Sequence, residues 1–148
     1  MKRFFTQVVV MLVVTVFFAG VLYAVSDPVG KSCEICKNEV KDKRFAMVIE
    51  KKKKTYYFDD IGCALKWRGS KCMPTQVQCD AVSHVFDYYT KKPVHIRAAY
   101  YLKDPSIQTP QGHGVIAFAS EEGAKRFMKE KGLNLKVMEF EEVVEFFK

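Results

Sequence analysis

The residues best suited to chemistry in this chain of 148 residues are its cysteines, which are Cys33, Cys36, Cys63, Cys72 and Cys79. If the protein is exported, this odd number leaves at least one thiol unpaired or bound to a metal. Cys72 and Cys79 lie close together in a stretch of loop character, and they are the plainest candidates for a disulfide. Cys33 and Cys36 form a CxxC motif. Two thiolates at this spacing can share one soft metal ion, close a small disulfide or belong to a zinc knuckle.

Two other uses of a CxxC motif fit this sequence poorly. A thioredoxin-like motif follows a strand and begins a helix, whereas only a short linker separates Cys33 from an apolar N-terminal run. A c-type haem needs histidine directly after the second cysteine, and this chain has Lys37 there. Metal binding is therefore the favoured function of the motif.

Cys63 and His113 are two further candidate ligands. We expect Asp60 to cap a helix, so that Cys63 lies in the first turn, where the helix dipole favours a thiolate and the charges of Asp59 and Asp60 oppose it. A buried cysteine that packs as a small apolar residue is the alternative. His113 lies between two glycines in a loop, which suits a ligand and equally suits a histidine on the surface.

The N-terminus has the pattern of an export signal. Lys2 and Arg3 precede an uncharged, apolar run over residues 8–25. Such a segment is either a cleaved signal peptide or an uncleaved membrane anchor with its basic end in the cytoplasm. We therefore expect the rest of the chain in the cell envelope, on the periplasmic side of the inner membrane, anchored or secreted.

Composition and charge narrow the remaining functions. The chain is 49% hydrophobic and 28% charged, which is typical of a globular protein, and it is too short for a multi-domain dinucleotide enzyme. Its net charge is +7, and four of its lysines form one run at residues 51–54. We interpret this run as a solvated hairpin turn, because basic residues with interleaved aromatics or a known nucleic-acid module are not evident. The sequence therefore predicts no nucleic-acid partner.

Hydrophobic periodicity predicts an α+β fold made of two strand-strand-helix-strand units. The boundaries are an N-terminal signal or anchor at 1–25, a linker with the CxxC motif at 26–44, and the two units at 45–90 and 91–148. The expected strands are 45–50, 55–58, 85–89, 94–102, 115–118 and 135–140, and the expected helices are 61–68, 120–131 and 141–147. Residues 57–67 align weakly with residues 117–127, since each segment reads as a strand, a capping residue and a helix.

Five segments together resemble the NosL family of nitrous oxide reductase accessory proteins. They are the CxxC motif, YYFDDIGC at 56–63, VFDYYT at 85–90, AAYY at 98–101 and TPQGHGVIAF at 109–118. The resemblance implies two strand-strand-helix-strand units, similar to the organomercurial lyase fold. It also implies an exported, membrane-tethered protein that binds Cu(I) and supports assembly of the copper site in nitrous oxide reductase.

The chain departs from the family pattern where methionines are usual. Lys37 follows the CxxC motif, Ala64 follows Cys63, and Gln111 replaces the methionine of a Pro-Met-Gly sequence. Methionine thioethers are soft ligands, and this chain lacks them at three positions. We therefore expect cysteine thiolates to form the soft-metal site instead. The predicted metal ligands are Cys33, Cys36, Cys63 and His113.

The predicted function is delivery of Cu(I), without catalysis, to a client copper enzyme or its maturation complex. Zn(II) is the other metal that such a site would accept. A second hypothesis is an adaptor whose cysteines are disulfide-bonded or hold zinc. A third is an enzyme, either a lyase of carbon–metal bonds by analogy of fold or a thiol oxidoreductase.

Overall fold

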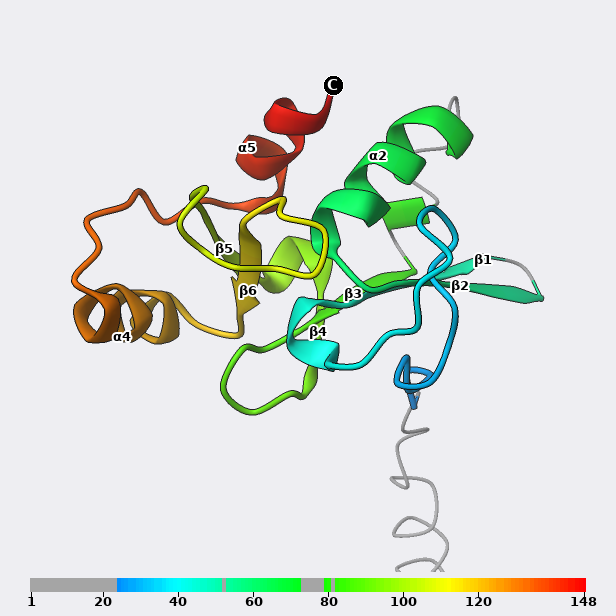
Figure 1. Ribbon diagram of the computed structural model, residues 1–148, viewed down its shortest axis with the longest axis horizontal. Helices are drawn as coiled ribbons and strands as arrows, with labels where there is room; N and C mark the ends of the chain where they lie inside the picture. The colour runs from blue at the N-terminus through cyan, green and yellow to red at the C-terminus, as the bar shows by residue number, and fades with distance from the viewer. Residues whose placement is uncertain (1–23, 52, 73–78, 81) are drawn as a thin grey trace, which may run out of the picture.

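The computed structural model describes residues 24–51, 53–72, 79–80 and 82–148 (Figure 1). The predicted leader at 1–25 lies outside the described residues except for its last two. Within the described part of the chain, no helix has both the length and the apolar character needed to cross a bilayer.

The first sheet has four antiparallel strands in the order β2-β1-β3-β4. Its strands are β1 (Met47–Lys51), β2 (Lys54–Phe58), β3 (Ser83–Phe86) and β4 (Pro93–His95). The central strand β1 is covered on both faces, with Met47 and Ile49 in one apolar cluster and Val48 in another. The short 3-10 helix η1 (Lys43–Phe45) leads into β1. Lys51 ends β1 and pairs with Lys54, which begins β2, so these two lysines of the run lie at the closed end of the β1–β2 hairpin.

The second sheet consists of β5 (Tyr100–Lys103) and β6 (Val115–Phe118), which pair antiparallel. Helix α4 (Glu121–Lys131) covers it by packing Ala124 and Phe127 against Ile116. Ser120 caps the start of α4, and Gly132 ends the helix in the left-handed conformation that a residue without a Cβ adopts readily. The sequence predicted both ends of this helix.

Helix α2 (Ile61–Lys71) follows β2 directly and begins at the Asp60 cap, as predicted, but it continues through Gly69 beyond the predicted end at residue 68. The chain ends in a short helix, α5 (Phe140–Val144), and the 3-10 helix η3 (Glu145–Phe147). Figure 1 shows α4 at one end of the molecule and the β1–β2 hairpin at the other, with α2 and α5 between them.

Four predicted strands are wrong in their extent. The strand expected at 45–50 begins at Met47, after η1, and the strand expected at 85–89 is β3 (Ser83–Phe86), which ends before a turn at residues 88–90.

The strand expected at 94–102 is split into β4 and β5 by the 3-10 helix η2 (Ile96–Ala98), where the chain passes from one sheet to the other with Ile96 buried. The strand expected at 135–140 is reduced to one bridge between Met138 and Tyr101, because the chain turns into α5 at Phe140. The second unit is therefore strand-strand-helix followed by a single bridged residue.

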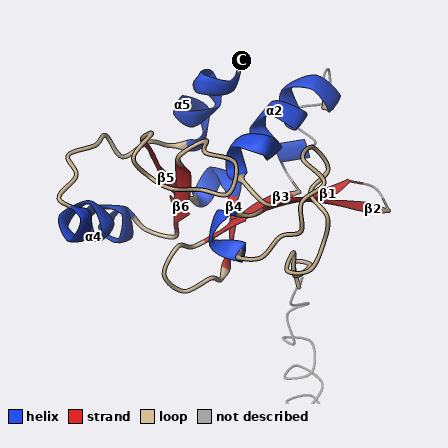
Figure 2. Ribbon diagram, viewed as in Figure 1, coloured by secondary structure: helices blue, strands red, loops and turns tan. Residues whose placement is uncertain are grey.

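The two sheets share one apolar core, and Figure 2 shows β5 and β6 between α4 and α2. This core joins Met47 and Phe58 of the first sheet to Tyr101 and Val115 of the second. Cys33, Cys63, Cys72 and Cys79 lie in the same cluster. These four cysteines are therefore part of the core that the two sheets share.

Candidate metal centre

A tight turn holds the CxxC motif beside the end of β2. The Cys33 N–H donates to the Asn38 carbonyl at 2.8 Å, and the Lys37 N–H donates to the Cys33 carbonyl at 3.1 Å. Lys37 adopts a φ of 66°, which is unusual for a residue with a side chain. The Glu34 N–H donates to the Tyr57 carbonyl at 3.0 Å. This last bond fixes the motif next to the segment that carries Asp59 and Cys63.

Three thiols and one carboxylate converge at this place. One ligand atom from each of Cys33, Cys36, Cys63 and Asp59 lies within 4.8 Å of all the others. Cys33, Cys63 and Asp59 are buried, and Cys36 is half-buried. The Cys36 thiol donates to Asp59 Oδ1 at 3.3 Å. Cysteine thiolates, with or without a carboxylate, form a donor set that suits soft or borderline metal ions.

The expected activation of Cys63 by the helix N-terminus is wrong. Burial raises the pKa of the Cys63 thiol well above its usual value, and electrostatic repulsion from the neighbouring Cys33, Asp60 and Asp59 side chains raises it further. Burial is also the main cause that raises the pKa of Cys36 to about 11. Desolvation and neighbouring negative charge therefore outweigh the dipole of the first helical turn. Both thiols are protonated at neutral pH and would release their protons on binding a metal.

His113 lies against Cys63 at the helix N-terminus. Its Nε2 atom is 3.8 Å from Cys63 Sγ. The ring packs edge-on to Phe147, with 5.8 Å between the ring centroids. The structure therefore places His113 beside Cys63, a predicted ligand like itself. It also adds Asp59 to the cluster of possible ligands.

Asp60 fastens the loop that carries His113 to the start of α2. Its carboxylate accepts from the Gly62 N–H at 2.8 Å, from the Thr109 hydroxyl at 2.7 Å and from the Gln111 N–H at 2.9 Å. The Gln111 side chain also donates to Asp59 Oδ2 at 2.8 Å. Gln111 thus orients Asp59, the one carboxylate of the cluster. The family resemblance implies a methionine at this position.

The remaining cysteines form a separate structural link. Cys72 and Cys79 are joined by a disulfide, which connects the C-cap of α2 to the residues before β3. Beside it, Arg68 makes two hydrogen bonds to Asp80, at 2.5 and 2.8 Å, and both side chains are buried. These contacts hold the C-terminal end of α2.

Asp59 is the site residue that sequence reasoning missed as a ligand. It is adjacent to the expected cap and four positions before Cys63, where the sequence indicates only a charge that opposes a thiolate. Its nearness to Cys36 depends on the turn of residues 33–38 and on the bond from Glu34 to Tyr57. Sequence spacing alone does not reveal either contact.

Comparisons with known proteins identify the family. The family model described as NosL matches residues 25–146. The chain belongs to the NosL family. This confirms the resemblance drawn from the sequence motifs, and no curated protein matches the chain.

A solved structure shares the mixed helix-and-sheet fold of this NosL-family chain. The chain is similar to the crystal structure of the copper chaperone NosL from Shewanella denitrificans, with a TM-score of 0.57 and 17% sequence identity. The match covers 80% of this chain and 94% of that one. At this identity the likeness establishes a common mixed helix-and-sheet fold.

Proposed function

We propose that this NosL-family protein is a copper chaperone that binds Cu(I) at Cys33, Cys36 and Cys63 and passes it to a client copper enzyme, such as nitrous oxide reductase, or to its maturation complex. One observation carries the proposal, namely that thiols from two separate segments converge within 4.8 Å. The solved relative from Shewanella denitrificans is itself called a copper chaperone. No catalytic step is part of this function.

The chemistry of the cluster supports binding followed by exchange. Thiolates are soft ligands that select Cu(I), and the buried positions of Cys33 and Cys63 would exclude water from the ion. Cys36 is half-buried, so it is the thiol that an incoming soft ligand of a client can approach. His113 and Asp59 flank the thiols as a further donor and as an acceptor for the Cys36 proton.

The proposal includes a location at the periplasmic side of the inner membrane. Residues 1–25 would either tether the protein or be removed as a signal peptide. Cell fractionation followed by mass measurement of the mature chain tests both outcomes. Recovery of an uncleaved protein from the cytosol would contradict the proposed location.

An anaerobic titration with Cu(I) against a competing chelator tests the binding function. The full chain is expected to bind one copper ion, and Cys33→Ser, Cys36→Ser and Cys63→Ser are each expected to weaken binding by at least about tenfold, which corresponds to 1.4 kcal/mol. The control is Met138→Leu, which removes a buried sulfur atom outside the cluster. Unchanged copper binding in all three serine variants would refute the site.

One observation favours a second candidate function. The cluster contains the carboxylate of Asp59, a hard ligand that zinc accepts more readily than Cu(I) does. An adaptor with structural Zn(II) would therefore use the same residues. Elemental analysis of the protein purified from its own cell envelope distinguishes the two, because zinc without copper would favour the adaptor.

A further inference from the structure

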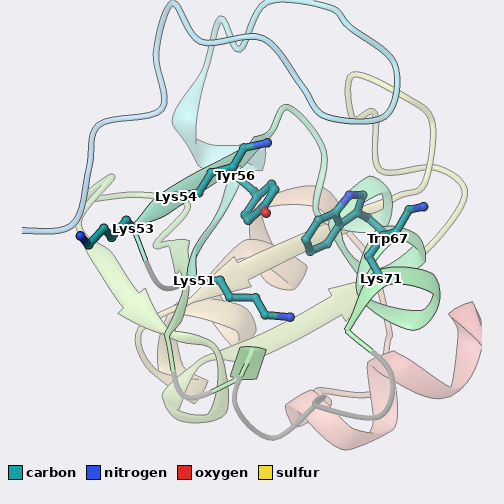
Figure 3. Close-up of a pocket in the computed structure, with 6 residues that line it drawn as sticks. All are labelled: Lys51, Lys53, Lys54, Tyr56, Trp67 and Lys71. Carbon is teal, nitrogen blue, oxygen red and sulfur yellow. The ribbon is translucent and has the colours of Figure 1, made fainter.

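A basic pocket with an aromatic wall lies between the β1–β2 hairpin and helix α2 (Figure 3). Its volume is about 600 Å³, which is in the range of sites that hold several side chains or a small molecule. We call it the lysine pocket. It is lined by Lys51, Lys53, Lys54, Tyr56, Trp67 and Lys71.

The pocket has a rigid apolar wall and a charged rim. Tyr56 of β2 packs on Trp67 of α2 with 4.6 Å between the ring centroids, and Trp67 also contacts Phe58. Lys54 Nζ lies 4.5 Å from the centre of the Tyr56 ring, within the range of a cation–π contact. Lys53, Lys54 and Lys71 are exposed. The lysine run is therefore more than a solvated turn, because the fold brings Lys71 from another element to the same side.

Two relationships place the lysine pocket near the cysteine cluster, one along helix α2 and one through an ion pair. Trp67 follows Cys63 by four residues on α2, so the two side chains lie on the same side of the helix. Glu34, inside the CxxC motif, has a carboxylate oxygen 4.0 Å from Lys54 Nζ. A molecule held in the pocket would therefore lie next to the segment that carries Cys33 and Cys36.

We propose that the lysine pocket docks an acidic segment of the protein with which this chain exchanges copper. This inference rests on the proposed function, because the partner is defined as the protein that exchanges copper with this chain. Four lysines around one concavity attract clustered carboxylates, and such complementarity raises the rate of encounter and fixes the orientation of the complex. Tyrosine and tryptophan in the wall are residue types that often supply much of the binding energy at protein interfaces.

Glu34 occupies the edge of this site as an internal competitor. Its contact with Lys54 is long, and the Lys54 side chain is 63% exposed, so the pair contributes little to stability. A carboxylate of the partner can therefore replace Glu34 on Lys54 at small cost. Docking would release the side chain of Glu34, the residue that follows Cys33 in the motif.

The test uses the fluorescence of Trp67, which is the only tryptophan in the chain and lines the pocket. The full chain in detergent is titrated with a short oligoglutamate peptide, and with an oligoglutamine peptide as the neutral control. Oligoglutamate is expected to change the emission saturably, with an affinity that falls as salt is added. Lys53→Gln with Lys71→Gln is expected to weaken binding at least about tenfold, and Glu34→Gln to strengthen it.

The control for total charge is Lys92→Gln with Lys129→Gln, which removes two exposed lysines that lie outside the pocket. This variant is expected to bind oligoglutamate within about twofold of the unaltered protein, a difference below 0.5 kcal/mol. Equal losses in the two double variants would overturn the proposal, because the attraction would then belong to the whole surface. Equal binding of oligoglutamine would overturn it as well.

Two further arms separate the possible outcomes. Vesicles of phosphatidylcholine with phosphatidylglycerol test whether an anionic lipid surface is the occupant. If the double variant Lys53→Gln with Lys71→Gln loses binding to vesicles but keeps its binding to oligoglutamate, the proposal of a protein partner is overturned. Cu(I) titration of the same variant is expected to give unchanged copper binding. Because the peptide titration is made on metal-free protein, failure of copper binding and failure of peptide binding are distinguishable.

Discussion

The imidazole of His113 lies directly over Gly62, so that a Cβ atom at position 62 would be 2.3 Å from His113 Cγ. Gly62 is the second residue of α2, and His113 belongs to the loop that Asp60 holds against the helix. The missing side chain is therefore what lets His113 approach Cys63. Glycine at this position serves the site rather than the helix.

Gly62→Ala is expected to displace His113 and the loop around it, and to lower the free energy of unfolding by about 1–3 kcal/mol through overpacking. Urea denaturation measures this loss. Gly123→Ala is the control, since it lies in the first turn of α4, where the nearest atom to a new Cβ is at 3.4 Å. That variant is expected to be neutral or more stable by about 0.5–1 kcal/mol, because alanine favours helix. Equal destabilisation of both variants would contradict the close approach.

Asp60→Ala is expected to cost about 2–4 kcal/mol of folding free energy, because one buried carboxylate satisfies a helix cap and two donors of the loop. Ser120→Ala removes only a cap, at the start of α4, and is expected to cost about 1 kcal/mol. Denaturant titrations of the two variants give the comparison. Similar costs would show that the loop contacts of Asp60 contribute nothing to stability.

Local signals were sufficient to predict the elements that are bounded by clear caps. Strand β6, the start of helix α2 and both ends of helix α4 follow from apolar periodicity with Asp60, Ser120 and Gly132 at these positions. The break at Ile96–Ala98 was not predictable, since glycine and proline are absent there and Ile96 is buried in its 3-10 turn as it would be in a strand. Only the presence of two separate sheets requires the turn.

The metal centre was predictable in its residue types but not in its full composition. The sequence identifies the CxxC motif and Cys63 as candidate metal ligands, and the structure brings their thiols together. At Cys63 the sequence sets the helix dipole against the charges of Asp59 and Asp60, whereas the largest effect on its pKa is burial, which depends on packing of the whole core. Asp59 joins the cluster through tertiary contacts of Cys36 and Gln111, which no local pattern encodes.

Asp59→Asn is expected to separate the affinities for the two metals. A carboxylate is a hard ligand, so its replacement should weaken Zn(II) binding about tenfold while changing Cu(I) binding less than about threefold. Competition titrations with chelators for each metal measure both constants. A larger loss for Cu(I) than for Zn(II) would show that Asp59 acts on the thiolates themselves.

Asp87 is expected to make the stability of the protein depend on acid pH. Burial tends to raise the pKa of Asp87, but hydrogen bonds from Ala119 and Thr90 outweigh it and lower the pKa below its ordinary value. The folded state therefore binds this proton more weakly than the unfolded state does. The stabilisation is present above the unfolded pKa of about 3.9 and is lost as the pH falls through the lower folded value.

Asp87→Asn should abolish that part of the pH dependence and reduce stability at neutral pH by about 1–3 kcal/mol. Unfolding free energies measured from neutral to acid pH test both effects. A variant whose stability falls with acid as steeply as that of the unaltered protein would assign the dependence to other carboxylates.

X-ray absorption spectroscopy at the copper edge of the Cu(I)-loaded protein tests the metal centre most directly. The predicted result is a shell of sulfur neighbours that loses one sulfur in Cys63→Ser and one in Cys36→Ser, since each thiol belongs to the cluster. A spectrum that is identical in Cys63→Ser and the unaltered protein would show that copper is held by the CxxC motif alone, and it would contradict a site shared between the motif and helix α2.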